Sequence, residues 1–167
     1  MVWQEFPEEA WDKVMRLNVY SIFWLTRALK GPLAAASGGS TDPSHIINIG
    51  SVAGTVAYEH DDNPSYLASK AAVNQLTKYF ALKLNEQHTV VNCIAPAVFP
   101  SNMTKHFSLS DDMKDWTANL HPAGRVGNMH DMAGLALFLG TKASAFVNGS
   151  TIHLDGGIVN MRMTPKL

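Results

Sequence analysis

Two side chains suited to proton transfer, Tyr66 and Lys70, stand four residues apart in the segment Ser65-Tyr66-Leu67-Ala68-Ser69-Lys70. If this segment is helical, both side chains lie on one face with their Cβ atoms about 5–6 Å apart. A free tyrosine has a pKa of about 10, and a nearby ammonium group stabilises the phenolate. The pair therefore predicts a general acid–base. The spacing alone is weak evidence, because an ordinary surface helix can also carry a tyrosine and a lysine.

A serine hydroxyl strengthens this interpretation. Ser51 follows directly on the short, β-branched apolar run 46–49 and Gly50, a pattern that predicts a buried strand ending in a turn. Open α/β sheets place their ligand sites at the carboxyl ends of strands. A hydroxyl at this position could hydrogen-bond a carbonyl oxygen of a substrate and stabilise its developing charge. The alternative is that Ser51 only caps a turn.

The elements needed to position these groups follow from the spacing of apolar residues. The expected helices cover 8–30, 64–84 and 131–139, with short helical pieces near 103–107 and 111–120, and the expected strands cover 46–49, 90–94 and 150–154. The first helix should fade at Gly31-Pro32 and end by residues 37–39. This strand–helix alternation predicts an α/β fold with a parallel sheet in a single domain over residues 1–167.

Composition narrows the functional classes. The 167 residues are 46% hydrophobic and 16% charged, with a formal net charge of -1, which is globular and argues against a dedicated nucleic-acid binder. The lone cysteine, Cys93, is expected to be buried in a strand, and it favours a reducing compartment. No signal peptide, transit peptide or membrane-spanning run is evident, so a cytoplasmic location is expected, with no membrane partner. The seven histidines are scattered and predict no metal site; His153 is expected to be packed within its strand.

Together these motifs resemble the short-chain dehydrogenase/reductase family. The strand with Gly50-Ser51-Val52-Ala53-Gly54, followed by Tyr66-Leu67-Ala68-Ser69-Lys70, is similar to the family's active-site pattern. Further matching segments are Leu17-Asn18-Val19, Val91-Asn92-Cys93-Ile94-Ala95-Pro96 and Leu154-Asp155-Gly156-Gly157. The motifs occur in the family order and cover nearly the whole chain. Segments 95–104 and 122–127 look like the 3-oxoacyl reductase branch of the rhamnolipid-biosynthesis type.

The resemblance implies a role for each matching residue. Tyr66 would be the catalytic acid/base, Lys70 would assist it and bind the nicotinamide ribose, Ser51 would orient the substrate carbonyl, and Asn18 would hold a water of a proton relay. The cofactor would be NADP or NAD, contacted by Tyr66, Lys70, Pro96, Ala97, Phe99 and Ser101. The substrate would be a small-molecule carbonyl compound or the matching alcohol.

Three departures from the family pattern affect these expectations. Ala97 stands where the family usually has glycine, which could disturb cofactor contact. The loop between Ser51 and Tyr66 looks about two residues longer than usual, which loop entropy tolerates. The Gly-rich turn that holds the pyrophosphate is absent from the sequence. We therefore expect a partial, truncated Rossmann-like sheet with residues 46–49 as an open edge, and weak or absent binding of NAD(P).

Two hypotheses follow. In the first, the chain is an oxidoreductase of this family. In the second, it is a non-catalytic interaction protein, because the helices over 8–30 and 64–84 are apolar enough to need cover on two faces. These helices would then support a homo-oligomer or pairing with a full-length relative.

Overall fold

Helices and strands alternate along the chain. The computed structural model describes residues 3–57, 63–104 and 119–160. The principal elements are α1 (Glu8–Met15), a π-helical segment (Arg16–Tyr20), α2 (Ser21–Ala36), β1 (Ser44–Ile49), α3 (Pro64–Leu84), β2 (Thr89–Pro96), α5 (Met129–Leu139) and β3 (Thr151–Leu154). Each predicted helix and strand within the described ranges is present, with small shifts at the ends except that α2 extends well past residue 30.

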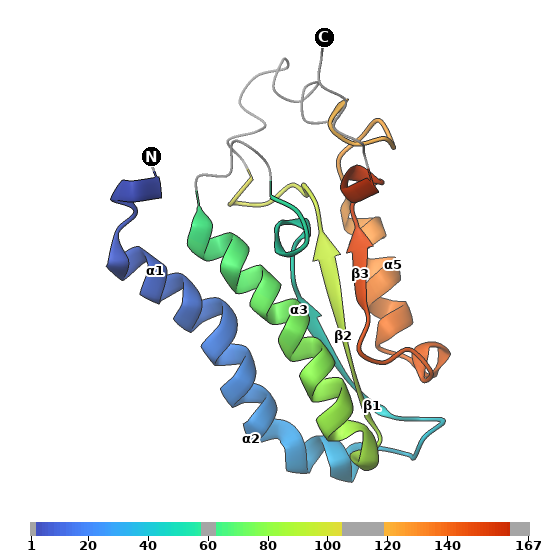
Figure 1. The fold of residues 1–167 in the computed structure, drawn as a ribbon. Helices are drawn as coiled ribbons and strands as arrows, with labels where there is room; N and C mark the ends of the chain where they lie inside the picture. The colour runs from blue at the N-terminus through green and yellow to red at the C-terminus, as the bar shows by residue number, and fades with distance from the viewer. Residues whose placement is uncertain (1–2, 58–62, 105–118, 161–167) are drawn as a thin grey trace.

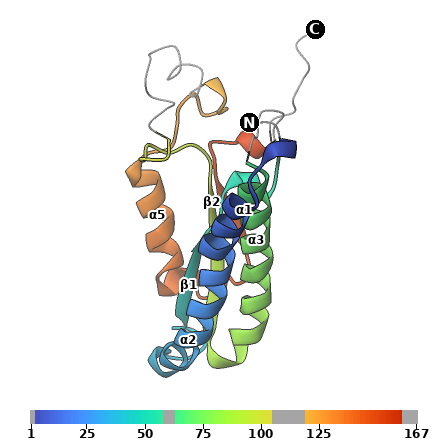
Figure 2. The ribbon, with the colours of Figure 1, turned by 90° about the vertical axis from the view of Figure 1, so that its left-hand side faces the viewer.

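The three strands form one parallel sheet in the order β1-β2-β3, with Ser44 paired to Thr89 and Cys93 paired to Thr151 at the start of each ladder. The long helix formed by α1 and α2 lies with α3 on one face of the sheet, and α5 lies on the other (Figures 1 and 2). The predicted α/β fold with a parallel sheet is confirmed. Because both faces of β2 are covered, all of its residues except Pro96 are buried.

Local sequence sets the limits of one helix, α3, whereas a contact with a distant residue holds the end of another, α2. Helix α3 has the predicted limits, since Asn63 Oδ1 accepts a hydrogen bond from Tyr66 N at 3.0 Å and Pro64 occupies the first turn. Helix α2 does not fade at Gly31-Pro32 as expected, but continues through Pro32; it ends at Ala36, before residues 37–39 as predicted. Its last turn is held from outside, because Ser44 Oγ donates to Leu33 O at 2.7 Å.

Some predicted features fall partly or wholly outside the described residues. The helical pieces near 103–107 and 111–120 lie almost entirely in the range 105–118, and residues 58–62 of the longer loop before α3 are also outside. In the part of the chain that is described, no helix is long and apolar enough to cross a membrane.

The core lies between α3 and β2. Phe80, Ala81 and Leu84 of α3 pack with Val91 of β2, and α2 adds Ile22 and Phe23. The Phe23 and Phe80 rings lie 5.9 Å apart, centroid to centroid, which fixes α2 against α3. This packing holds the amino-terminal turn of α3, which bears Tyr66, above the carboxyl ends of the strands (Figure 1).

Strand β1 is an edge of the described sheet, as the sequence predicted. Ile49 at its end is 49% exposed, and Leu17 and Leu25 beside it are also exposed. A groove of about 320 Å³ runs between β1 and the π-helical and α2 segments, with Asn18 and Lys70 in its lining. The open edge and this apolar groove therefore lie on the same side of the molecule.

The loop before β3 is attached to β2 through a buried asparagine, Asn92. Its Nδ2 donates to Val147 O at 2.7 Å, and its Oδ1 accepts from Ser150 N at 3.0 Å; the residue is 1% exposed. Because Asn92→Ala removes both partners, we expect the free energy of unfolding to fall by about 2–3 kcal/mol in urea titrations. The exposed Asn102→Ala is the control, expected within about 0.5 kcal/mol of the parent. Equal effects of the two substitutions would contradict this role.

Candidate active site

Tyr66 and Lys70 lie together in the first turns of α3. The Lys70 Nζ atom is 5.5 Å from the centre of the Tyr66 ring, and it donates a hydrogen bond of 2.9 Å to Ile49 O at the end of β1. Burial lowers the pKa of Lys70, an effect that interaction with Cys93 partly opposes. The ammonium group is thus held beside the phenol and tied to the carboxyl end of a strand, as proton transfer at this edge would require.

The same Tyr-x-x-x-Lys spacing occurs a second time on α3. The Lys83 Nζ atom lies 5.8 Å from the ring centre of Tyr79, but Tyr79 is 47% exposed. It lies about 20 Å along the helix axis from Tyr66, toward the opposite end of the sheet. Local spacing is therefore equal in the two pairs, and only the first lies where the strands end.

Ser51 occupies the turn that follows β1 and is 8% exposed. Its Oγ accepts a hydrogen bond from Ala53 N at 3.2 Å, so the hydroxyl does cap the short helical turn Val52–Gly54. The turn is pressed onto α3: a Cβ at Gly54 would lie 2.6 Å from the backbone carbonyl of Lys70. Ser51 is therefore flanked on both sides by residues in contact with Lys70, namely Ile49 and Gly54.

Asn18 lies in the π-helical segment Arg16–Tyr20, a feature that the sequence did not predict. Single π-helical turns within α-helices are frequent at functional sites. Its Nδ2 donates to Ser69 Oγ at 3.0 Å, and Ser69 Oγ donates to Tyr66 O at 2.8 Å. Asn18 and Lys70 also line the same groove. The segment thus joins Asn18 to the turn of α3 that carries the tyrosine and the lysine.

The residues expected on the cofactor side follow β2. Pro96 ends the strand, and Ala97 N donates to Leu154 O at 3.2 Å. Among described residues other than glycine only His88 has a positive φ, so alanine at position 97 causes no backbone strain. The Phe99 ring fills space that a Cβ at Gly127 would occupy, 2.2 Å from Phe99 Cζ. Ser101 N donates to Thr104 Oγ1 at 2.8 Å, which closes a turn after Phe99.

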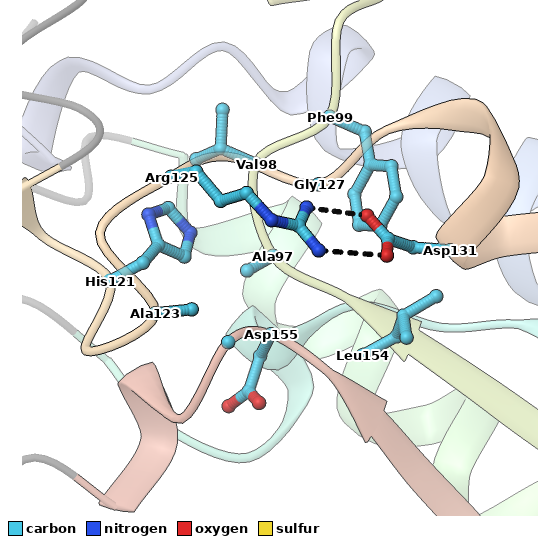
Figure 3. Close-up of a pocket in the computed structure, with 11 residues that line it drawn as sticks. Ala97, Val98, Phe99, His121, Ala123, Arg125, Gly127, Asp131, Leu154 and Asp155 are labelled. Carbon is cyan, nitrogen blue, oxygen red and sulfur yellow. Dashed lines mark hydrogen bonds and ion pairs between the residues drawn. The ribbon is translucent and has the colours of Figure 1, made fainter.

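A cavity of about 220 Å³ lies beside this segment, lined partly by Ala97 and Phe99 (Figure 3). Arg125 and Asp131 cross it as a bidentate pair, with nitrogen–oxygen distances of 2.7 and 2.9 Å. Asp131 also accepts from Asn128 N at 2.8 Å and completes a capping box at the start of α5. The Asp155 carboxylate points away from this pair and caps the turn after β3. The polar groups of the cavity are therefore largely engaged in fixing its walls.

The Arg125–Asp131 pair predicts a loss of stability in acid. Its hydrogen bonds hold the pKa of Asp131 at about 2, below its usual value of 3.8. The stabilisation is present above about pH 4 and is lost as the pH falls through about 2. In urea titrations from about pH 5 to about pH 2, the free energy of unfolding should fall more steeply in the parent than in Asp131→Asn, whose side chain at position 131 does not titrate. Parallel curves for the two proteins would refute this.

Cys93 is fully buried in β2, as predicted, and burial raises the pKa of its thiol. Among the described residues, no group of three or more histidine, cysteine, aspartate or glutamate side chains could hold a metal ion. The candidate groups for chemistry are the tyrosine, lysine, serine and asparagine described above.

Comparison with known proteins identifies the family. A family model described as enoyl-(acyl carrier protein) reductase matches residues 3–159. The rhamnolipids biosynthesis 3-oxoacyl-[acyl-carrier-protein] reductase of Pseudomonas aeruginosa is 40% identical over 154 residues, which are 92% of this chain and 59% of that protein. The chain belongs to the short-chain dehydrogenase/reductase family. Another member, the gluconate 5-dehydrogenase of Gluconobacter oxydans, is 34% identical over 93% of the chain and 58% of its own length.

Solved structures of short-chain dehydrogenases/reductases agree with the fold. The Pseudomonas aeruginosa RhlG/NADP active-site complex has a TM-score of 0.84 and 38% identity, covering 90% of this chain and 60% of that one. A gluconate 5-dehydrogenase from Burkholderia cenocepacia in complex with NADP and tartrate has a TM-score of 0.84 and 30% identity, covering 95% of this chain and 60% of that one. The chain thus spans about three fifths of the length of these relatives.

Proposed function

We propose that this chain carries the catalytic groups of an NADP-dependent oxidoreductase that reduces a carbonyl group, or oxidises the matching alcohol. The observation that carries the proposal is the position of the Tyr66 phenol and the Lys70 ammonium beside the turn that bears Ser51. In the reducing direction Tyr66 donates its proton to the carbonyl oxygen, and Lys70 stabilises the resulting phenolate. Ser51 donates a hydrogen bond to the same oxygen and favours its developing charge.

A proton relay would then restore the phenol. Asn18 is joined to Ser69, and both Asn18 and Lys70 open into the groove along β1. This supports a role for Asn18 in holding a water that passes a proton to Lys70. The half-buried position of Lys70 suits this role, because burial lowers its pKa and eases transfer of a proton from the ammonium.

The residues of this chain fit the nicotinamide end of a dinucleotide. Lys70 offers an ammonium for ribose hydroxyls, and the segment from Pro96 through Ala97, Phe99 and Ser101 is fixed after β2 without backbone strain. A bound nicotinamide would supply the hydride. The sequence contains no Gly-rich turn for the pyrophosphate, so we propose that the isolated chain binds NADP weakly. The NADP complexes among the solved relatives support NADP over NAD.

The substrate class we favour is a short 3-oxoacyl thioester, on the basis of the 40% identity to a 3-oxoacyl reductase. The test is consumption of NADPH by the purified chain at millimolar NADPH, with a 3-oxoacyl thioester in one arm and 5-ketogluconate in the other. Faster reduction of the thioester supports the proposal, and preference for the keto sugar would move the substrate class toward the gluconate dehydrogenases. No consumption with either would contradict an active oxidoreductase.

An apolar helical surface favours the second hypothesis, association without catalysis. Tyr20 of the π-helical segment, Trp24 of α2, and Tyr79 and Leu82 of α3 are exposed, with 80% exposure at Leu82. Aromatic side chains such as the first three are enriched at protein interfaces. A chain that forms dimers in light scattering but never consumes NADPH would support this function over the first.

A further inference from the structure

A hydrogen bond joins the turn after β1 to the far strand of the sheet. The Thr55 Oγ1 and His153 Nε2 atoms lie 2.9 Å apart, although the residues are 98 positions apart in sequence. Thr55 directly follows the turn Val52–Gly54, which Ser51 caps. His153 belongs to β3, which is not a neighbour of β1. The bond therefore connects the segment after β1 directly to a strand that does not pair with β1.

His153 and the turn after β1 lie on the same face of the sheet, the face that α3 covers. His153 is paired with Ala95 of β2. Cys93, two residues earlier on the same strand, contacts Asn74 of α3, so Ala95 and His153 face α3 as well. The turn before Thr55 also contacts α3, so the imidazole and Thr55 meet on this face of the sheet.

The next residue of β3, Leu154, is hydrogen-bonded to the segment that follows β2. Leu154 O accepts a hydrogen bond from Ala97 N at 3.2 Å, at the start of the segment proposed to contact the nicotinamide. Two consecutive residues of β3 thus bind two loops. His153 binds the loop after β1 through its side chain, and Leu154 binds the loop after β2 through its backbone. Gly54, the residue before Thr55, is attached to α3, because Asn74 Nδ2 donates to Gly54 O at 3.2 Å.

We infer that His153 is a positioning residue that, through Thr55, fixes the Ser51 turn relative to the segment after β2. This inference rests on the proposed function and deepens it, because it explains how the serine and the cofactor-side residues keep a constant separation. Loss of the bond should leave the fold intact and let the Ser51 turn move. Misplacing a group that stabilises charge on the substrate oxygen slows the chemical step more than it weakens cofactor binding.

The test compares Thr55→Val, which removes the hydroxyl at nearly constant shape, with Thr55→Ser, which keeps it. We expect backbone amides of residues 50–57 to exchange hydrogen about 3–10-fold faster in Thr55→Val and at the parent rate in Thr55→Ser. In the reduction assay, kcat should fall about 10-fold in Thr55→Val while KM for NADPH stays within about twofold. The double variant Thr55→Val/His153→Phe should be no worse than the more impaired of its two single variants.

Each result decides one question. If the parent chain consumes no NADPH, the proposed function fails, and the exchange comparison alone still decides whether the bond holds the turn. Equal exchange in Thr55→Val and Thr55→Ser would overturn the inference, as would additive effects of the Thr55 and His153 substitutions. A uniform loss of kcat in both Thr55 variants would also overturn it, because serine restores the hydroxyl.

Discussion

Tyr66→Phe is expected to lower the rate of NADPH-dependent carbonyl reduction by about 10²–10⁴-fold, the usual contribution of a general acid. The substitution removes one oxygen atom and leaves the ring beside Lys70. The backbone contacts of this turn, Asn63 with Tyr66 N and Ser69 with Tyr66 O, do not involve the phenol. We therefore expect the free energy of unfolding to stay within about 0.5 kcal/mol of the parent.

The chain supplies a matched control for this experiment. Tyr79 has the same relation to Lys83 that Tyr66 has to Lys70, on the same helix. Tyr79→Phe should leave the rate unchanged, because Tyr79 lies about 20 Å along α3 from Tyr66, away from the turn that bears Ser51. Equal losses of reduction rate in the two variants would show that the loss does not depend on the position of Tyr66 at the candidate site. Full activity in Tyr66→Phe would remove Tyr66 from the proposed reaction.

The second large effect is expected at Gly54. A Cβ there would lie 2.6 Å from the backbone C and O atoms of Lys70 and 2.9 Å from Ala71 N. Backbone atoms within a helix cannot yield, so the turn and α3 must separate. We expect Gly54→Ala to reduce the free energy of unfolding by roughly 1–3 kcal/mol in urea titrations. Because Ser51 and Lys70 would move apart, the reduction rate should fall as well.

Gly134→Ala is the control for this substitution. Gly134 lies within α5, and a Cβ there would meet no atom within 4 Å. Alanine in an open helical position restricts the unfolded chain and should raise the free energy of unfolding by roughly 0.5–1 kcal/mol. The free energy of unfolding is therefore expected to fall in Gly54→Ala and to rise in Gly134→Ala. A Gly54→Ala variant as stable as the parent would mean that the Ser51 turn is not pressed against α3.

The two tyrosine–lysine pairs show what local sequence can predict and what it cannot. The apolar spacing was sufficient to predict the limits of α3, because helical periodicity is set by residues within one or two turns. The same rule places Lys70 beside Tyr66 and Lys83 beside Tyr79. It contains nothing that distinguishes one pair from the other, since that depends on where the strands end.

Other parts of the site depend on contacts between distant residues. The bond from Asn18 to Ser69 spans 51 residues, and the bond from Thr55 to His153 spans 98. The sequence suggested only that His153 is packed in a strand, since its face and its partner depend on the register of β2 with β3. The extent of α2 past Pro32 likewise depends on a contact from Ser44.

The amino-acid sequence by itself determined the order of the elements, the parallel α/β class and the helical spacing that places Lys70 beside Tyr66. Those properties are encoded over a few neighbouring residues, where helical and strand periodicity act. The tertiary structure decided which tyrosine faces the ends of the strands, how the Ser51 turn is pressed against Lys70 and which residues hold it there. These depend on packing between segments that the chain brings together only when the core of α2, α3 and β2 has formed.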